Sequence, residues 1–265
     1  MTSLRSALKS ATALAAFSLS FPLASWAEEP LPVVATFSIL GDMVERIGGE
    51  HIALTTLVGP DGDAHVYQPT PKVARSVAEA DVLFLNGLEF EGWLERLAEA
   101  ASFGGAMVVA TKGVVPIAFD DHDDHDDHDD HDDHDEHDDH DDHVEHEDHD
   151  DHAGHDHGAF DPHAWQSLEN AVIYANNIAA GLAQADPENA GDYYANRAAF
   201  ITEVETLRAD IGAMMKSLPA DKRTVVTPHD AFGYFAATYD LTFVAPQGMS
   251  TDSEVSAADV AALIT

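Results

Sequence analysis

The sequence predicts an α/β protein with parallel sheets and flanking helices, arranged as two lobes. Three observations support this prediction. Short apolar runs alternate with helical patterns through residues 33–110, an unusually long helical pattern covers 167–218, and the alternation resumes through 224–245. Alternating strands and helices are typical of a parallel sheet covered on both faces, because each crossover helix lies against the sheet.

Four strands and three helices are expected before the long helical segment. Apolar runs predict the strands at residues 33–36, 52–58, 82–85 and 107–110. Apolar residues at helical spacing indicate the helices, within 39–47, 73–80 and 93–101. Gly48-Gly49 ends the first helix, and Thr70 and Pro71 supply an N-cap and a first-turn proline to the second.

The segment 167–218 is expected to be helical with one interruption, at Asp186-Pro187. Its second half carries one apolar stripe along several turns, made of Phe200, Val204, Leu207, Ile211 and Met214. A strand, a helix and a strand then follow, at 224–227, 231–238 and 241–245. A capping box at Ser256–Asp259, with Val255 and Val260 as its hydrophobic staple, opens a further helix.

Two strands and an unfinished helix do not close a core, so we expect the second lobe to be truncated in this sequence. We expect a signal peptide at residues 1–27 and an N-terminal α/β lobe at 28–166, which includes an acidic loop at 120–157. A connecting helical segment should follow at 167–218, and then the incomplete start of a C-terminal α/β lobe at 219–265.

The first 27 residues have the features of a secretory signal peptide. Arg5 and Lys9 precede a mostly apolar run through Ala24, which is too short to span a membrane, and Ser25-Trp26-Ala27 resembles a cleavage site. The sequence has no cysteine, which excludes disulfides, thiolate metal sites and a lipid-bearing cysteine after the cleavage site. We therefore expect a soluble protein of a Gram-negative periplasm.

Residues 120–157 are almost entirely aspartate and histidine. They hold 22 of the 49 acidic residues, and the net charge of −37 excludes nucleic acid and anionic membranes as partners. The tract has no apolar surface to offset the entropy of ordering, so we expect a mobile loop. A plain solvating linker would not need imidazole at every third position, so we favour metal capture. The thirteen histidines of this auxiliary metal loop are His122, His125, His128, His131, His134, His137, His140, His143, His146, His149, His152, His155 and His157.

Three other histidines occur where a parallel α/β fold binds ligands. His65 lies in the loop after the 52–58 strand, His163 at the entry to a helix, and His229 directly after the 224–227 strand. Ligands in open parallel sheets bind beyond the carboxyl ends of the strands. We therefore expect these three imidazoles to bind one metal ion; a lone histidine would more often be an ordinary hydrogen-bonded or exposed residue, as we expect for His51 at the surface.

The residues around these histidines resemble those of the zinc and manganese substrate-binding proteins of ABC importers, the periplasmic zinc-uptake type (cluster A-I). With the His/Asp tract, the similarity covers nearly the whole mature chain. The motifs that carry it are Asp63-Ala64-His65-Val66-Tyr67-Gln68-Pro69-Thr70-Pro71, Asp161-Pro162-His163-Ala164-Trp165 and Pro228-His229-Asp230-Ala231-Phe232-Gly233-Tyr234-Phe235.

The resemblance implies two α/β lobes joined by a long rigid helix, with one metal ion between them. It implies His65, His163 and His229 as metal ligands and a fourth, acidic ligand beyond Thr265. Manganese carriers of this type tend to have a carboxylate at the third position, so His229 favours Zn²⁺, as does the preference of zinc for imidazole. The implied partners are an ABC transporter membrane permease and, in some relatives, a periplasmic zinc metallochaperone, with the protein itself expected to be a monomer.

The acidic neighbours Asp63, Asp161 and Asp230 have two open interpretations. Each could orient an imidazole N–H, or each could cap backbone at the surface; Asp230, immediately before a helix, suits an N-cap.

Other functions remain open at this stage. A zinc hydrolase is disfavoured, because the sequence contains no His-Glu-x-x-His motif, no Gly-x-Ser-x-Gly turn and no Walker phosphate loop. We therefore expect no enzymatic activity and no catalytic residues. A periplasmic metal buffer that uses only the tract, and a manganese receptor, are the alternatives to a zinc receptor.

Overall fold

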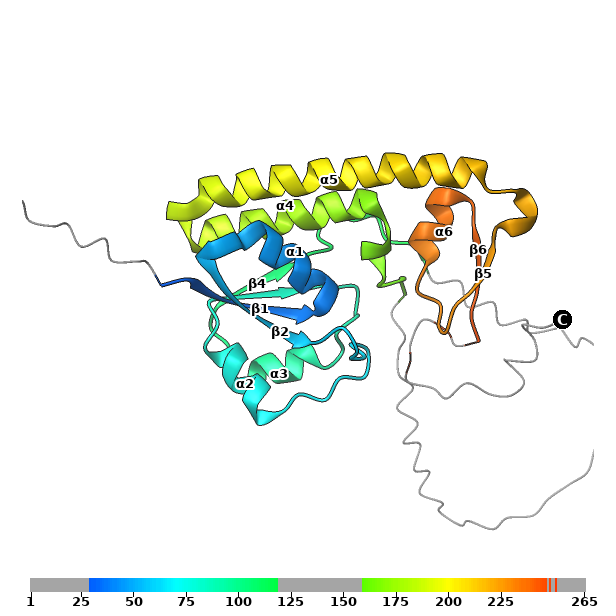
Figure 1. Ribbon diagram of the computed structural model, residues 1–265. Helices are drawn as coiled ribbons and strands as arrows, with labels where there is room; N and C mark the ends of the chain where they lie inside the picture. Colours follow the sequence, from blue (N-terminus) through cyan, green and yellow to red (C-terminus); the bar gives the residue numbers. More distant parts are fainter. Residues whose placement is uncertain (1–28, 119–158, 247, 249–250, 252–265) are drawn as a thin grey trace, which may run out of the picture.

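A computed structural model describes residues 29–118, 159–246, 248 and 251 (Figure 1). The expected signal peptide, His/Asp tract and capping box at Ser256–Asp259 lie outside the described residues. Their interpretations therefore stay predictions.

The first sheet has four parallel strands in the order β2-β1-β3-β4. Its members are β1 (Leu31–Phe37), β2 (Ile52–Val58), β3 (Val82–Leu85) and β4 (Ala106–Val109). All four predicted strands form; β1 is longer than expected at both ends, and β4 begins and ends one residue earlier than expected. The carboxyl ends of β1, β2 and β3 therefore lie side by side at one edge of the sheet (Figure 1).

Three helices predicted from apolar spacing also form, as α1 (Ser38–Gly48), α2 (Pro71–Ala78) and α3 (Leu94–Ala100). Gly49 follows α1 with a φ of 59°, a conformation that glycine adopts without strain. The Thr70 hydroxyl accepts from the Val73 N–H at 3.4 Å, which confirms the predicted N-cap of α2. In Figure 1, α1 and α4 cover one face of the sheet while α2 and α3 lie on the other.

The long helical segment is split as predicted into α4 (Leu168–Ala185) and α5 (Ala190–Ser217), separated by a short 3₁₀ turn, η3 (Pro187–Asn189). The helix α4 buries Tyr174, Ile178 and Leu182 against the first sheet and α1. The two helices run alongside each other, and α5 extends beyond the first sheet (Figure 1).

The apolar stripe of α5 is buried only in its first half. Phe200 and Val204 are buried, but Leu207 and Met214 are 49% and 57% exposed. Periodicity correctly placed these residues on one face of the helix. The first half of the stripe lies where α5 packs against α1 and α4, and the helix then extends beyond α4 (Figure 1), so the same pattern no longer produces burial.

A second parallel pair lies near the far end of α5, formed by β5 (Thr224–Val226) and β6 (Thr242–Val244) around α6 (Gly233–Tyr239). The expected strands and helix are present with shorter bounds. The prediction that Asp230 caps α6 is wrong, because the helix begins after Phe232 and has no side-chain cap. The α/β fold class with parallel sheets is confirmed; the division into lobes stays a prediction. None of the helices formed by the described residues could cross a membrane.

Candidate metal centre

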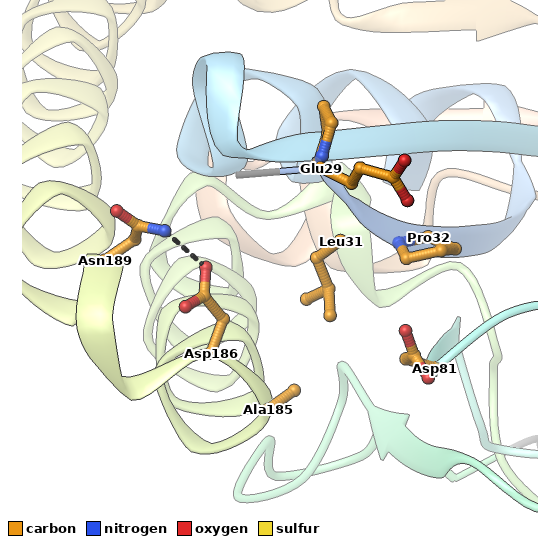
Figure 2. A pocket seen from close by; sticks show the side chains of 8 residues that line it. Glu29, Leu31, Pro32, Asp81, Ala185, Asp186 and Asn189 are labelled. Carbon is orange, nitrogen blue, oxygen red and sulfur yellow. Dashed lines mark hydrogen bonds between the residues drawn. The ribbon is translucent and has the colours of Figure 1, made fainter. Parts of the chain in front are cut away.

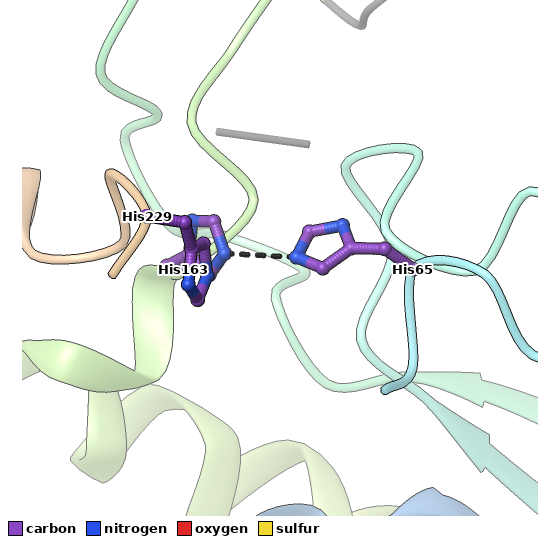
Figure 3. Close-up of side chains that lie close together, drawn as sticks. All are labelled: His65, His163 and His229. Carbon is purple, nitrogen blue, oxygen red and sulfur yellow. Dashed lines mark hydrogen bonds between the residues drawn. The ribbon is translucent and has the colours of Figure 1, made fainter. Parts of the chain in front are cut away.

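The structure brings His65, His163 and His229 together although they are far apart in the sequence (Figure 3). One ring nitrogen from each lies within 4.8 Å of those of the other two. The Nε2 atoms of His65 and His163 are 3.1 Å apart. Zn–N bonds of about 2.0–2.1 Å at tetrahedral angles hold two nitrogens roughly 3.3 Å apart, so this spacing suits a shared ion.

Each of the three histidines lies in a loop that leads from a strand or into a helix. His65 follows β2, and the loop of residues 86–91 follows β3, so both start from the same edge of the sheet. His163 directly precedes the 3₁₀ turn η2 (Ala164–Gln166), which leads into α4. His229 lies between β5 and α6. In a parallel sheet, loops at the carboxyl ends meet, which is why ligand sites occur there.

His163 is the most enclosed of the three, with 1% of its surface exposed. The carboxylate of Asp161 accepts from the His163 backbone N–H at 2.9 Å, and the same Oδ1 lies 2.8 Å from the ring Nδ1. A proton on Nδ1 satisfies this contact and leaves the Nε2 lone pair facing His65. Such a carboxylate fixes the ring orientation and increases the basicity of the imidazole as a metal ligand.

The loop that carries His65 is held by bonds to its backbone. The Asp63 carboxylate accepts from the His65 N–H at 2.9 Å, and Trp93 Nε1 donates to the Ala64 carbonyl at 2.7 Å. A turn closed by the Gly62 N–H on the Gly59 carbonyl, at 3.0 Å, precedes them. These contacts fix the direction in which His65 leaves the loop.

Phe90, which the sequence reasoning missed, forms an aromatic wall beside the histidines. Its ring centroid lies 4.7 Å from that of His65 and 6.0 Å from that of His163. It also contacts Phe37 and Trp165 at 5.1 and 4.9 Å. An apolar wall excludes water from one side of the imidazoles and strengthens electrostatic interactions within the site.

The turn that presents Phe90 is strained and is held by a buried carboxylate. Gly87, Leu88 and Glu89 have positive φ angles of 89°, 53° and 60°, which non-glycine residues rarely adopt. Glu91 accepts from the N–H groups of Asn86 and Gly87 at 2.7 and 3.2 Å. Burial raises the pKa of Glu91, although these hydrogen bonds and one from Thr36 act in the opposite direction. The carboxylate therefore supports the turn rather than facing the imidazoles.

His229 is half-buried, and its backbone carbonyl accepts from the Thr227 hydroxyl at 3.1 Å. Burial, and then the neighbouring charge of His163, lowers the pKa of His229, while nearby acidic groups act against this shift. Burial and the charge of Asp161 raise the pKa of Asp230. A lowered pKa keeps the His229 imidazole neutral, which is the form that binds metal.

The structure gives different contacts to the three acidic neighbours of the histidines. Asp161 contacts an imidazole nitrogen, Asp63 bonds to a backbone N–H, and Asp230 is not the cap of α6.

His51, expected at the surface, is only partly exposed. It lies 2.9 Å from Asp192 and packs edge-on against Tyr193, and it takes no part in the cluster.

A separate hollow of about 390 Å³ lies at the opposite end of the first sheet (Figure 2). Its acidic lining comes from Glu29, Asp81 and Asp186. Asp186 accepts hydrogen bonds from Asn189 and Tyr193, at 2.8 and 2.6 Å, so its carboxylate stabilises the turn between α4 and α5. This hollow lies at the amino ends of the strands, away from the edge where parallel sheets bind ligands.

Comparison with known proteins identifies the family. The model of the ZnuA family, described as zinc-uptake complex component A periplasmic, matches residues 33–265. The chain belongs to this family. The resemblance found in the sequence motifs is thereby confirmed.

Curated relatives of this ZnuA-family chain include several metal-binding lipoproteins. The manganese-binding lipoprotein MntA of Halalkalibacterium halodurans is 30% identical over 82% of this chain and 60% of its own length. The manganese ABC transporter substrate-binding lipoprotein PsaA of Streptococcus pneumoniae is 29% identical over 80% of this chain and 60% of its own. The chain thus spans about 60% of the length of these relatives.

Solved structures share the fold of this ZnuA-family chain. A structure of TroA superposes with a TM-score of 0.70 at 26% identity, covering 89% of this chain and 72% of that one. A manganese-bound mutant of the periplasmic metal binding protein from Candidatus Liberibacter asiaticus gives a TM-score of 0.68 at 26% identity, covering 89% and 75%. These similarities support the α/β fold class.

Proposed function

We propose that this protein is a periplasmic substrate-binding protein that carries Zn²⁺ to an ABC importer. His65, His163 and His229 are the proposed metal ligands. The observation that carries the proposal is the approach of three imidazole nitrogens to within 4.8 Å of one another, with no thiolate available anywhere in the chain. Family membership supports transport rather than catalysis, and the membrane permease is the proposed partner.

Zinc is the proposed cargo because all three clustered donors are imidazoles. Imidazole nitrogen suits Zn²⁺, whereas Mn²⁺ favours carboxylate and water oxygens in octahedral sites. The names of MntA and PsaA favour the second candidate, a manganese receptor. Replacing His229 by aspartate should separate these candidates. A zinc receptor should lose affinity for Zn²⁺ and gain relative affinity for Mn²⁺, whereas an unchanged preference for Mn²⁺ in both forms would favour the manganese receptor.

The His/Asp tract is proposed as an auxiliary loop that captures metal weakly and raises its concentration near the cluster. The described stem of the tract supports this arrangement, because Ala118 pairs with Phe160 only three residues before His163. A tethered donor replaces a freely diffusing ion by one held at high effective concentration. We also propose that the protein is exported through a cleaved signal peptide and that a periplasmic zinc metallochaperone is a second partner, which would load it with metal.

Deleting residues 120–157 tests whether the tract captures metal weakly while the three clustered histidines bind it tightly. We expect the equilibrium Zn²⁺ affinity of one tight site to change by less than tenfold, about 1.4 kcal/mol, while loading from a chelator becomes slower. Titration against competing chelators measures the first quantity and stopped-flow mixing the second. Loss of all tight binding on deletion would instead identify the protein as a metal buffer that works through its tract.

A further inference from the structure

Tyr234 connects the helix that follows His229 to the segment that precedes His163. It lies in the first turn of α6 and is buried. Its hydroxyl donates to the Asp161 carbonyl at 2.9 Å and accepts from the Ile117 N–H at 3.2 Å. One phenol thereby uses its donor on the segment that contains Asp161 and its acceptor on the segment that contains Ile117.

The two partners of Tyr234 are themselves paired. The Asp161 N–H donates to the Ile117 carbonyl at 2.9 Å, next to the antiparallel bridge between Ala118 and Phe160. Tyr234 therefore bonds to a short two-stranded ribbon rather than to one flexible loop. Asp161, at the end of this ribbon, is the residue whose side chain contacts His163 Nδ1.

The start of α6 also fits closely against the Asp161 carboxylate. A Cβ atom added to Gly233 would lie 2.6 Å from Asp161 Oδ2, closer than such contacts occur. The other oxygen of the same carboxylate, Oδ1, lies 2.8 Å from His163 Nδ1. Glycine at this position lets the helix approach the group that orients His163. The α6 backbone and its tyrosine thus both lie against Asp161.

We propose that Tyr234 is a positioning residue of the metal centre, which holds α6 and the preceding His229 loop against the Asp161–His163 segment. This inference rests on the proposed function of the three histidines. His229 stands five residues before Tyr234, and its ring centroid lies 5.4 Å from that of His163. Holding the third imidazole near the other two before metal arrives reduces the ordering that binding must otherwise supply.

The test compares Tyr234→Phe with Tyr239→Phe in the full chain. Both tyrosines belong to α6, but the Tyr239 hydroxyl makes no hydrogen bond within the described residues. Zn²⁺ affinity is measured by competition with chelators of graded strength. We expect Tyr234→Phe to weaken the tight site about tenfold, with a faster release of Zn²⁺ into excess chelator, and Tyr239→Phe to weaken it less than about twofold.

A second comparison separates positioning of His229 from a general loss of stability. In a His229→Ala background, Tyr234→Phe should cause no further loss of Zn²⁺ affinity, because the ligand it positions is already gone. An equal loss in both backgrounds would overturn the inference. The inference would also be overturned if the wild-type chain binds one tight zinc equivalent and the Tyr234→Phe variant binds it with the same affinity. A wild-type chain without any tight equivalent would overturn the proposed function, and this inference with it.

Discussion

His163 and His229 reach the same point from parts of the molecule that are packed differently. His163 is 1% exposed, is oriented by Asp161 and lies beside the core of the first sheet. His229 is half-buried and follows β5, whose three residues are all exposed, with Val226 at 66%. His65 stands with His163, at an Nε2 separation of 3.1 Å. Within the described residues, two imidazoles thus lie beside the packed first sheet, and the third follows a strand whose side chains are exposed.

This difference indicates how metal binding and structure are linked. If the three histidines bind one ion as proposed, we expect the pair of His65 and His163 to contact it first, and the imidazole of His229 then to link the second sheet to the first. Because a ligand stabilises only the arrangement that it binds, the tight complex should order the second sheet more than the first. The contrast between the two sheets can be tested by substitutions on either side.

The largest expected effect concerns packing of the two sheets. Leu83 is fully buried in β3, so Leu83→Ala should reduce the free energy of unfolding of the metal-free protein by about 2–5 kcal/mol. Val226→Ala, on the exposed β5, should cost less than about 0.5 kcal/mol. Denaturant titration measures both. Equal losses would show that the second sheet is packed as tightly as the first.

The next effect concerns the orientation of His163. Asp161→Asn removes the charge that supports the Nδ1 proton, so Zn²⁺ affinity should fall by about 10–100-fold. Asp186→Asn is the matched control, because the Asp186 carboxylate also has two hydrogen-bond partners, here two side chains, but lines the hollow at the far end of the sheet. Chelator competition measures both variants. If the control loses as much affinity as Asp161→Asn, the carboxylate has no specific role at His163.

The smallest effect concerns acidification. Metal binds the neutral imidazole, and burial followed by the charge of His163 lowers the pKa of His229, so protons compete for it only at lower pH. An unperturbed histidine has a pKa of about 6.5, and the tract binds metal only through neutral imidazoles. Lowering the pH to about 6 should therefore release the weakly held equivalents while the tight one stays bound, within about tenfold in affinity. Equilibrium dialysis at neutral pH and at about pH 6 measures the number of zinc equivalents that stay bound. Simultaneous loss of all equivalents would contradict the prediction.

The sequence predicted the parallel sheets and the three clustering histidines because both depend on local patterns. Apolar runs mark strands, and the carboxyl ends of parallel strands meet, so His65 and His229 could be located without coordinates. The α5 stripe is exposed beyond Val204, because periodicity shows which residues share a face and not whether another element covers that face. The cap at Asp230 failed because α6 begins two residues later than the pattern indicates.

The contacts that hold the three histidines in position could not be predicted from sequence spacing. The contact between Phe90 and His65, and the bond from Trp93 to the Ala64 carbonyl, join residues from different loops whose relative positions only the folded sheet determines. One signal was present, since Asn86-Gly87 marks a turn directly after the third strand, at the same edge of the sheet as the His65 loop. Residues in that turn were candidates for the site by the same topological argument.

The most direct test of the account is the stoichiometry of tight zinc binding in the full chain and in a variant with alanine at positions 65, 163 and 229. Both proteins keep the His/Asp tract, so weak binding is common to them. We expect the wild-type chain to retain one zinc equivalent against a strong chelator and the variant to retain none. A variant that still holds one tight equivalent would show that the ion binds elsewhere, and would contradict the proposed centre.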